Sequence, residues 1–194
     1  MRNRILFAAV TLALFPNAAM AHVGAGSTAS FIAGFAHPYS GLDHVAVMVA
    51  VGLWAALKGG SALWVWPCAF VGVMLIGGLL GMAHLQVPFV EPGILASVVA
   101  LGLLVALAVD LPIWLGAAII GLFAIFHGHA HGSEVAENIG GAEYMIGFAL
   151  ATASLHAIGL GVALTLSRAR MRAVVRLAGA ACVVLGVGLF TGFL

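Results

Sequence analysis

The stretch WVWPCAFVGVMLIGGLLGMAH, residues 64–84, contains no Asp, Glu, Lys or Arg. It is about as long as the roughly 20 apolar residues that an α-helix needs to cross the hydrocarbon core of a bilayer. The whole chain of 194 residues is similar, because 64% of it is hydrophobic, 7% is charged and its mean hydropathy is +1.22. So little polar surface cannot cover a water-soluble globule. The sequence therefore predicts an all-α integral membrane protein.

Six stretches of this kind follow one another with short connections. Because no soluble domain or linker interrupts them, the chain is expected to form six transmembrane helices in a single domain, residues 22–194. The expected spans are residues 42–57, 64–84, 93–109, 113–130, 142–167 and 174–194. In the second span, Gly77 and Gly81 form a GxxxG step, which predicts close packing against another helix.

Residues 1–21 have the composition of a cleaved secretory signal peptide. Its features are, in order, basic Arg2 and Arg4, an apolar run at residues 5–15, Pro16 and the small-x-small cleavage site Ala19-Met20-Ala21. The apolar run is too short to span a bilayer, which favours cleavage over the alternative of a retained first helix. The mature chain then begins at His22, outside the cytoplasm.

The distribution of basic residues predicts the orientation. If the chain starts outside, the inner loops carry Lys58 and the arginines of residues 168–172, and no Lys or Arg falls in an outer loop after cleavage. We therefore expect a multi-pass protein of the bacterial cytoplasmic membrane with a periplasmic N-terminus.

The 7 basic and 6 acidic residues nearly balance, so nucleic acid is not an expected partner. Four tryptophans are expected at the inner headgroup boundary: Trp54, Trp64, Trp66 and Trp114.

Imidazole and carboxylate side chains inside so apolar a chain are costly in lipid and therefore indicate function. Most of them fall near the outer ends of the expected spans. Imidazole and carboxylate without thiolate favour a borderline divalent ion such as Ni(II), Co(II) or Zn(II) over Cu(I). The candidate metal ligands are His22, His37, Asp43, His44, His127, His129, His131, Glu134 and His156.

The first cluster of candidates, HPYSGLDH at residues 37–44, lies at the start of the first expected span. A carboxylate in the first turn of a helix is ordinary, because Asp43 satisfies free backbone donors there. That explanation leaves His37 and His44 unaccounted for. We therefore interpret the cluster as metal-binding.

The second cluster is FHGHAHGSE at residues 126–134. Helical spacing places His127 and His131 four residues apart on one face, with Glu134 three residues further on. Such a pair of histidines can share one metal ion. Gly128 and Gly132 weaken the helix and leave room beside the imidazoles.

Two histidines stand apart from these clusters. At the start of the mature chain, His22 offers an amine and an imidazole that could capture metal from outside. The alternative interpretation is that the mature chain simply begins with a disordered segment and His22 has no role in binding. His156 lies well inside the fifth span, where a polar side chain usually faces a cavity or a partner. We interpret it as a second ion station or a proton relay.

At its two clusters the sequence resembles the HupE/UreJ family of nickel and cobalt permeases. The family's first pattern, a histidine followed after five residues by Asp-His, is present as His37, Asp43 and His44. The second, Phe-His-Gly-x-Ala/Val-His-Gly-x-Glu, is present over residues 126–134. The resemblance implies uptake of Ni(II), in some members Co(II), for the assembly of hydrogenase or urease. The ion is then cargo, and no prosthetic group is expected.

The sequence has no GxxxxGK[ST] nucleotide loop and little soluble mass, so the chain is not expected to hydrolyse ATP and should be a facilitator or secondary transporter. We expect no enzyme, because the histidines continue from the outer face to His156 and resemble a route more than a single catalytic centre. Its partners are the lipid bilayer and the divalent ion, and a homo-oligomer and an outer-membrane metal delivery system are compatible with this interpretation. Two alternatives stay open. One is a membrane-embedded zinc metallohydrolase, in which Asp43 or Glu134 activates a zinc-bound water. The other is a metal sensor or chaperone-like binder without flux.

Overall fold

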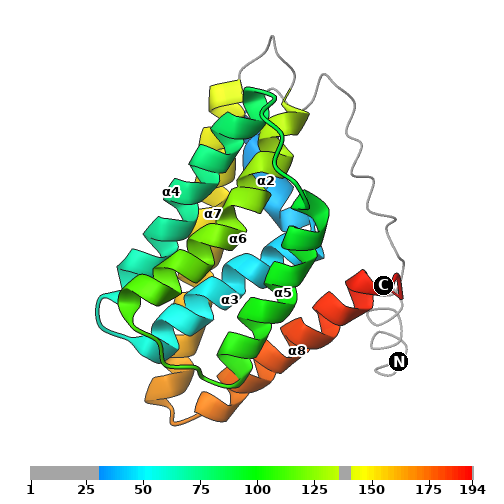
Figure 1. Ribbon diagram of the computed structural model, residues 1–194. Helices are drawn as coiled ribbons and strands as arrows, with labels where there is room; N and C mark the ends of the chain where they lie inside the picture. The colour runs from blue at the N-terminus through cyan, green and yellow to red at the C-terminus, as the bar shows by residue number, and fades with distance from the viewer. Residues whose placement is uncertain (1–30, 136–140, 194) are drawn as a thin grey trace, which may run out of the picture.

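The computed structural model describes residues 31–135 and 141–193, which form helices and loops without a strand. The expected signal peptide and His22 lie outside the described residues. Figure 1 shows the helices as a bundle in which α8 lies at one edge beside α5. They are α2 (Phe31–Ser40), α3 (Leu42–Lys58), α4 (Ala62–Met82), α5 (Val90–Ala106), α6 (Ile113–Glu134), α7 (Gly141–Arg168) and α8 (Arg172–Phe190).

Four of these helices, α4, α6, α7 and α8, are each long and apolar enough to cross a membrane. Helices α2 and α3 pass the same test together, although the chain bends by 85° between them, so the described residues offer up to five spans. Helix α5 is apolar but shorter, with 17 residues. Each of the six expected spans coincides with a helix, and the all-helical architecture is confirmed. Crossing of the membrane by all six stays a prediction.

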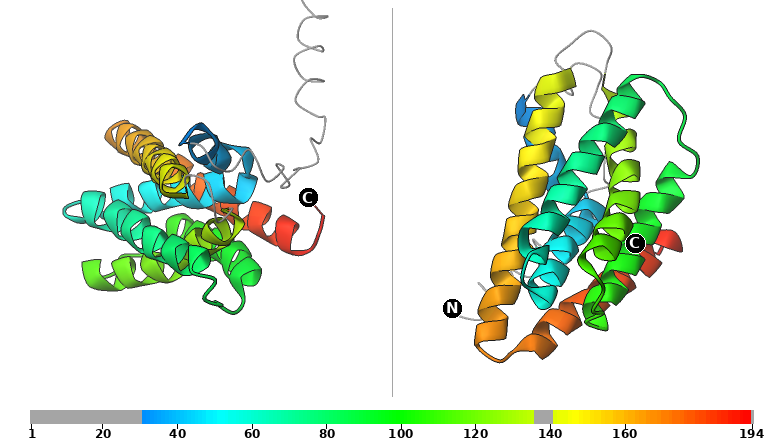
Figure 2. Two further views of the ribbon diagram at one scale, coloured as in Figure 1. Left: turned by 90° about the horizontal axis from the view of Figure 1, so that it is seen from above. Right: turned by 60° about the vertical axis from the view of Figure 1, so that its left-hand side comes forward.

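Helix α3 is the buried centre of the bundle. It packs against α7, α5 and α4, and Figure 2 shows it in cyan between α7 and α4 when the molecule is viewed from above. Val47, Val51 and Trp54 of α3 have no exposed surface. The helices around it expose apolar side chains such as Leu122 and Val184, as a surface that faces lipid requires.

Glycines allow α4 and α6 to approach each other closely. A Cβ at Gly77 would overlap the carbonyl oxygen of Ile125, and a Cβ at Gly81 would overlap the backbone at His129. The close packing predicted from the GxxxG step is therefore confirmed. It fixes the histidine-bearing half of α6 against α4.

The tryptophans only partly match the expectation. Trp64 and Trp114 are 64% and 71% exposed, as side chains at a headgroup boundary would be. Trp54 and Trp66 are instead fully buried, with ring centroids 4.2 Å apart. The indole N–H of Trp54 donates to the carbonyl of Val109 in the α5–α6 connection, and that of Trp66 donates to the carbonyl of Ile113, the first residue of α6. The interfacial expectation is wrong for these two because each indole finds its acceptor inside the protein.

Candidate metal centre

The corner between α2 and α3 turns two histidines toward the same space. His37 lies in the last turn of α2 and His44 in the first turn of α3. Gly41, between the two helices, has an extended backbone with φ −103° and ψ 125°. A Cβ on Gly41 would lie 2.6 Å from Asp43 Oδ1. A larger residue there would displace the side chains in the first turn of α3.

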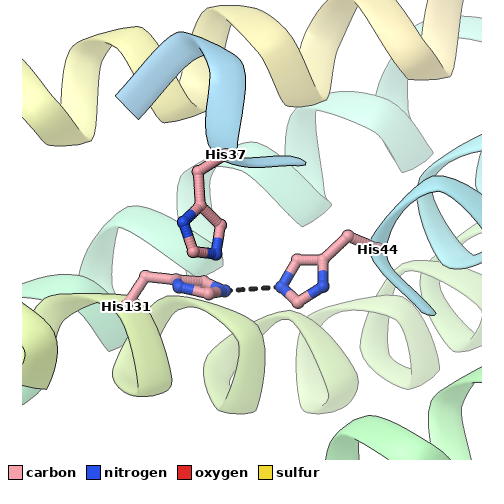
Figure 3. A group of neighbouring side chains, drawn as sticks. All are labelled: His37, His44 and His131. Carbon is pink, nitrogen blue, oxygen red and sulfur yellow. Dashed lines mark hydrogen bonds between the residues drawn. The ribbon is translucent and has the colours of Figure 1, made fainter. Parts of the chain in front are cut away.

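His131 of α6 completes a cluster with His37 and His44, and Figure 3 shows the three rings pointing toward one another. One ring nitrogen from each lies within 4.8 Å of the other two. His44 and His131 are only 7% and 4% exposed, whereas His37 is half-buried. The Nε2 atoms of His44 and His131 are 2.5 Å apart. Three imidazoles that converge from three helices form a donor set suited to a divalent transition metal.

A carboxylate lies behind each of the two facing imidazoles. Asp43 Oδ1 is 2.9 Å from His44 Nδ1, and Glu134 Oε2 is 3.5 Å from His131 Nδ1. Neither Nδ1 makes a hydrogen bond, but a carboxylate this close favours a proton on the nearer nitrogen, so each ring is expected to direct an Nε2 lone pair toward the other. Two lone pairs this close repel each other unless a cation or a shared proton lies between them. Carboxylate–histidine pairs orient imidazole ligands in many metal sites.

His127 is a fourth imidazole, fully buried one turn before His131. Its ring centroid lies 5.1 Å from that of His44. The Ser97 hydroxyl of α5 donates to the carbonyl of Ile94, so its oxygen accepts from Nε2 of His127 at 3.0 Å. This arrangement leaves a lone pair on His127 Nδ1, which has no hydrogen-bond partner.

Phe70 packs between His127 and His156. Its ring centroid lies 5.8 Å from that of His127 and 5.0 Å from that of His156, and its side chain has no exposed surface. His156 is 2% exposed, and neither of its ring nitrogens has a hydrogen-bond partner. Burying an unsatisfied polar group costs about 1–3 kcal/mol, a cost that packing alone does not explain.

His129 lies outside the cluster of imidazoles. It follows His127 by two residues and therefore points to a different side of α6. Its Nε2 donates to the carbonyl of Leu85 at 2.7 Å. On that side His129 lines a cavity of about 290 Å³ together with His84 and Ser133.

The expected ligands therefore separate into groups. The structure gathers His37, Asp43, His44, His127, His131 and Glu134, and it places His129 and His156 apart from them. Sequence reasoning did not single out Ser97 or Phe148, whose ring centroid lies 4.6 Å from that of His131. Ser97 offered a signal, because it is a lone hydroxyl within an apolar span. Phe148 offered none, since an aromatic residue in an apolar helix is ordinary.

A bundle of apolar helices with imidazoles gathered between them defines a multi-pass membrane protein with a candidate transition-metal site. The family model described as HupE / UreJ protein matches residues 10–189. Protein HupE of Rhizobium leguminosarum bv. viciae is 43% identical over 190 residues, which cover 98% of each chain. No solved structure matches the chain. The chain belongs to the HupE/UreJ family, and the resemblance seen in its two histidine clusters is confirmed.

Proposed function

We propose that this chain is a permease that imports Ni(II), with Co(II) as a second cargo, across the bacterial cytoplasmic membrane. It acts as a facilitator or a secondary transporter. Membership of the HupE/UreJ family supports metal transport and gives no support to the metallohydrolase alternative. The observation that carries the proposal is the pair of facing Nε2 atoms on His44 and His131, each with a carboxylate behind its ring.

The three converging imidazoles of His37, His44 and His131 are the first binding station in this proposal. Asp43 and Glu134 hold two of the rings in the ligating tautomer. If the metal–nitrogen bonds resemble those of zinc, at about 2.0–2.1 Å, the ligand nitrogens stand roughly 3 Å or more apart. The rings of His44 and His131 therefore separate slightly when the ion enters. Neutral imidazoles bind strongly enough to replace water around the ion and weakly enough to release it.

The inward route leads from His127 past Phe70 to His156. Because the Phe70 ring contacts both imidazoles, passage of the ion requires that ring to move. An ion at His156 satisfies ring nitrogens that otherwise lack partners. His156 is thus the second station, and His22 and His129 are assigned to capture of the ion at the outer surface.

The topology is part of the proposal. Residues 1–21 are removed, the mature N-terminus is periplasmic, and residues 22–194 form one six-span transport domain. The helices that are long and apolar enough to cross a membrane support a multi-pass protein, and the concentration of basic residues in the expected inner loops supports the orientation.

The proposal is tested by metal uptake in cells that lack their own nickel importers. Wild-type protein and His44→Ala are compared at matched membrane abundance, and Ni, Co and Zn are measured in the same cells. We expect saturable nickel accumulation that is lost in the variant. Abundant, correctly inserted wild-type protein that accumulates none of the three metals would contradict transport. Metal binding without uptake would identify a sensor or chaperone-like binder instead.

A further inference from the structure

A cavity of about 390 Å³ lies at the end of α3 opposite to the histidine cluster. His44 is in the first turn of α3, whereas the cavity is lined by Leu57 and Lys58 at its last turn. Figure 1 shows that α5 also ends and α8 begins in this region. The cavity is therefore separate from the proposed metal centre by the length of a helix.

Positive charge predominates in this cavity. Its charged lining consists of Lys58, Asp110, Arg172 and Arg176. Lys58 forms an ion pair with Asp110, so these two charges offset each other. Among the described residues, no carboxylate lies within ion-pair distance of Arg172 or Arg176. Within the described part of the chain, the cavity thus presents two guanidinium groups without a counter-ion.

Both arginines are exposed, and each guanidinium donates to one backbone carbonyl. Arg172 Nη2 donates to the carbonyl of Leu57 at 3.3 Å, and Arg176 Nε donates to the carbonyl of Ala106 at 2.7 Å. A guanidinium has five N–H donors in a planar fork, so each arginine retains donors for a ligand. Guanidinium forks match phosphoryl oxygens in geometry and in charge.

The surroundings of the cavity favour a lipid as the source of the phosphoryl group. Leu107 stands in the chain between Ala106, whose carbonyl accepts from Arg176, and Ala108, which lines the cavity. Its side chain is 64% exposed, which gives an acyl chain an apolar surface to lie on. Basic pockets at helix ends on the cytoplasmic side of a membrane bind anionic headgroups. We propose that this cavity binds the phosphodiester headgroup of an anionic lipid with the chemistry of phosphatidylglycerol. The proposal holds whichever metal the chain transports.

Native mass spectrometry of the full-length protein tests the lipid site. The protein is equilibrated in detergent with phosphatidylglycerol or with phosphatidylcholine, and the lipid that stays bound is measured. We expect selective retention of phosphatidylglycerol. Because each basic residue near the surface contributes on the order of 1 kcal/mol, the double variant Arg172→Gln/Arg176→Gln should lower this retention about thirtyfold. The matched control Arg168→Gln/Arg170→Gln removes the same charge outside the cavity and should leave retention unchanged.

Several results would overturn the proposal. One is equal retention of the two lipids by the wild-type protein, a comparison that needs no variant and stays decisive if the double variant fails to fold. Equal losses in the two double variants would show a general effect of charge. Inorganic phosphate that binds the wild-type protein and displaces phosphatidylglycerol completely at millimolar concentration would identify a site for a free anion instead of a lipid.

Discussion

The Nε2 atoms of His44 and His131 lie 2.5 Å apart, although 87 positions separate these residues in the chain. Asp43 and Glu134 stand at the far nitrogens of the two rings, so a carboxylate, two imidazoles and a second carboxylate follow one another from α3 to α6. Each carboxylate favours the tautomer that directs a lone pair inward. A cation or a shared proton between the rings would relieve the repulsion between these lone pairs.

Two histidines of α6 should therefore differ in their effect on metal binding. His131→Ala removes a converging imidazole and is expected to weaken Ni(II) binding by more than about 100-fold, because even residues behind the ligands contribute 10–100-fold. His129→Ala removes an imidazole that donates to Leu85 on another side of the helix. Because His129 is assigned to capture at the outer surface and not to the cluster, the affinity of the cluster for Ni(II) should stay close to the wild-type value in this variant. Isothermal titration calorimetry of the purified variants measures the two Ni(II) affinities. Equal losses of affinity in the two variants would place His129 in the same site as His131.

Asp43 should act through its charge on His44. Asp43→Asn keeps the size of the side chain and an oxygen that can accept from backbone N–H groups in the first turn of α3, but it removes the negative charge next to His44 Nδ1. We expect Ni(II) affinity to fall about 10–100-fold while thermal stability changes little. Asp110→Asn, a carboxylate at the other end of the bundle, is the control and should bind as wild type. Normal binding by Asp43→Asn combined with lost stability in Asp43→Ala would reduce Asp43 to a helix cap.

Hydropathy predicted most of the fold, because α4, α6, α7 and α8 are long apolar runs that resemble no soluble element. Helix α2 was not predicted. Pro38 and Gly41 both precede the first expected span, but Pro38 lies inside α2 and only Gly41 interrupts the helices. Pro38 has no N–H and so leaves the carbonyl of Gly34 without its helical donor, and α2 ends two residues later.

The site was predictable where it follows helical spacing and unpredictable where it depends on the bend. The spacing of four residues placed His127 and His131 on one face of α6, and the same rule separates His129 from them. The contact between His37 and His131, with ring centroids 4.4 Å apart, depends on the 85° bend between α2 and α3. Hydrophobic periodicity carries no information about such an angle.

Close contact between α4 and α6 should matter for stability. Gly77→Ala places a methyl group against the carbonyl of Ile125, and overpacking of this kind typically costs about 1–3 kcal/mol. Gly72 is on the same helix, but a Cβ there meets nothing within 4 Å, so Gly72→Ala should be neutral or slightly stabilising. Thermal unfolding in one detergent compares the two variants. Equal stabilities would show that α4 can move away from α6 without cost.

His156→Leu separates transport from structure. If the imidazole only packs, its replacement should alter stability and leave uptake intact. If it receives the ion, nickel uptake should be lost while Ni(II) binding at the outer cluster persists. The thermal stability of His156→Leu should then equal or exceed that of the wild type, because an apolar group replaces a buried ring whose nitrogens lack partners.

The control variant is Thr152→Val, one turn earlier on α7. It removes a buried hydroxyl that donates to Met74 Sδ at 3.6 Å and should leave nickel uptake unchanged. Normal uptake by His156→Leu would remove this residue from the route and leave the outer cluster as the whole of the binding path.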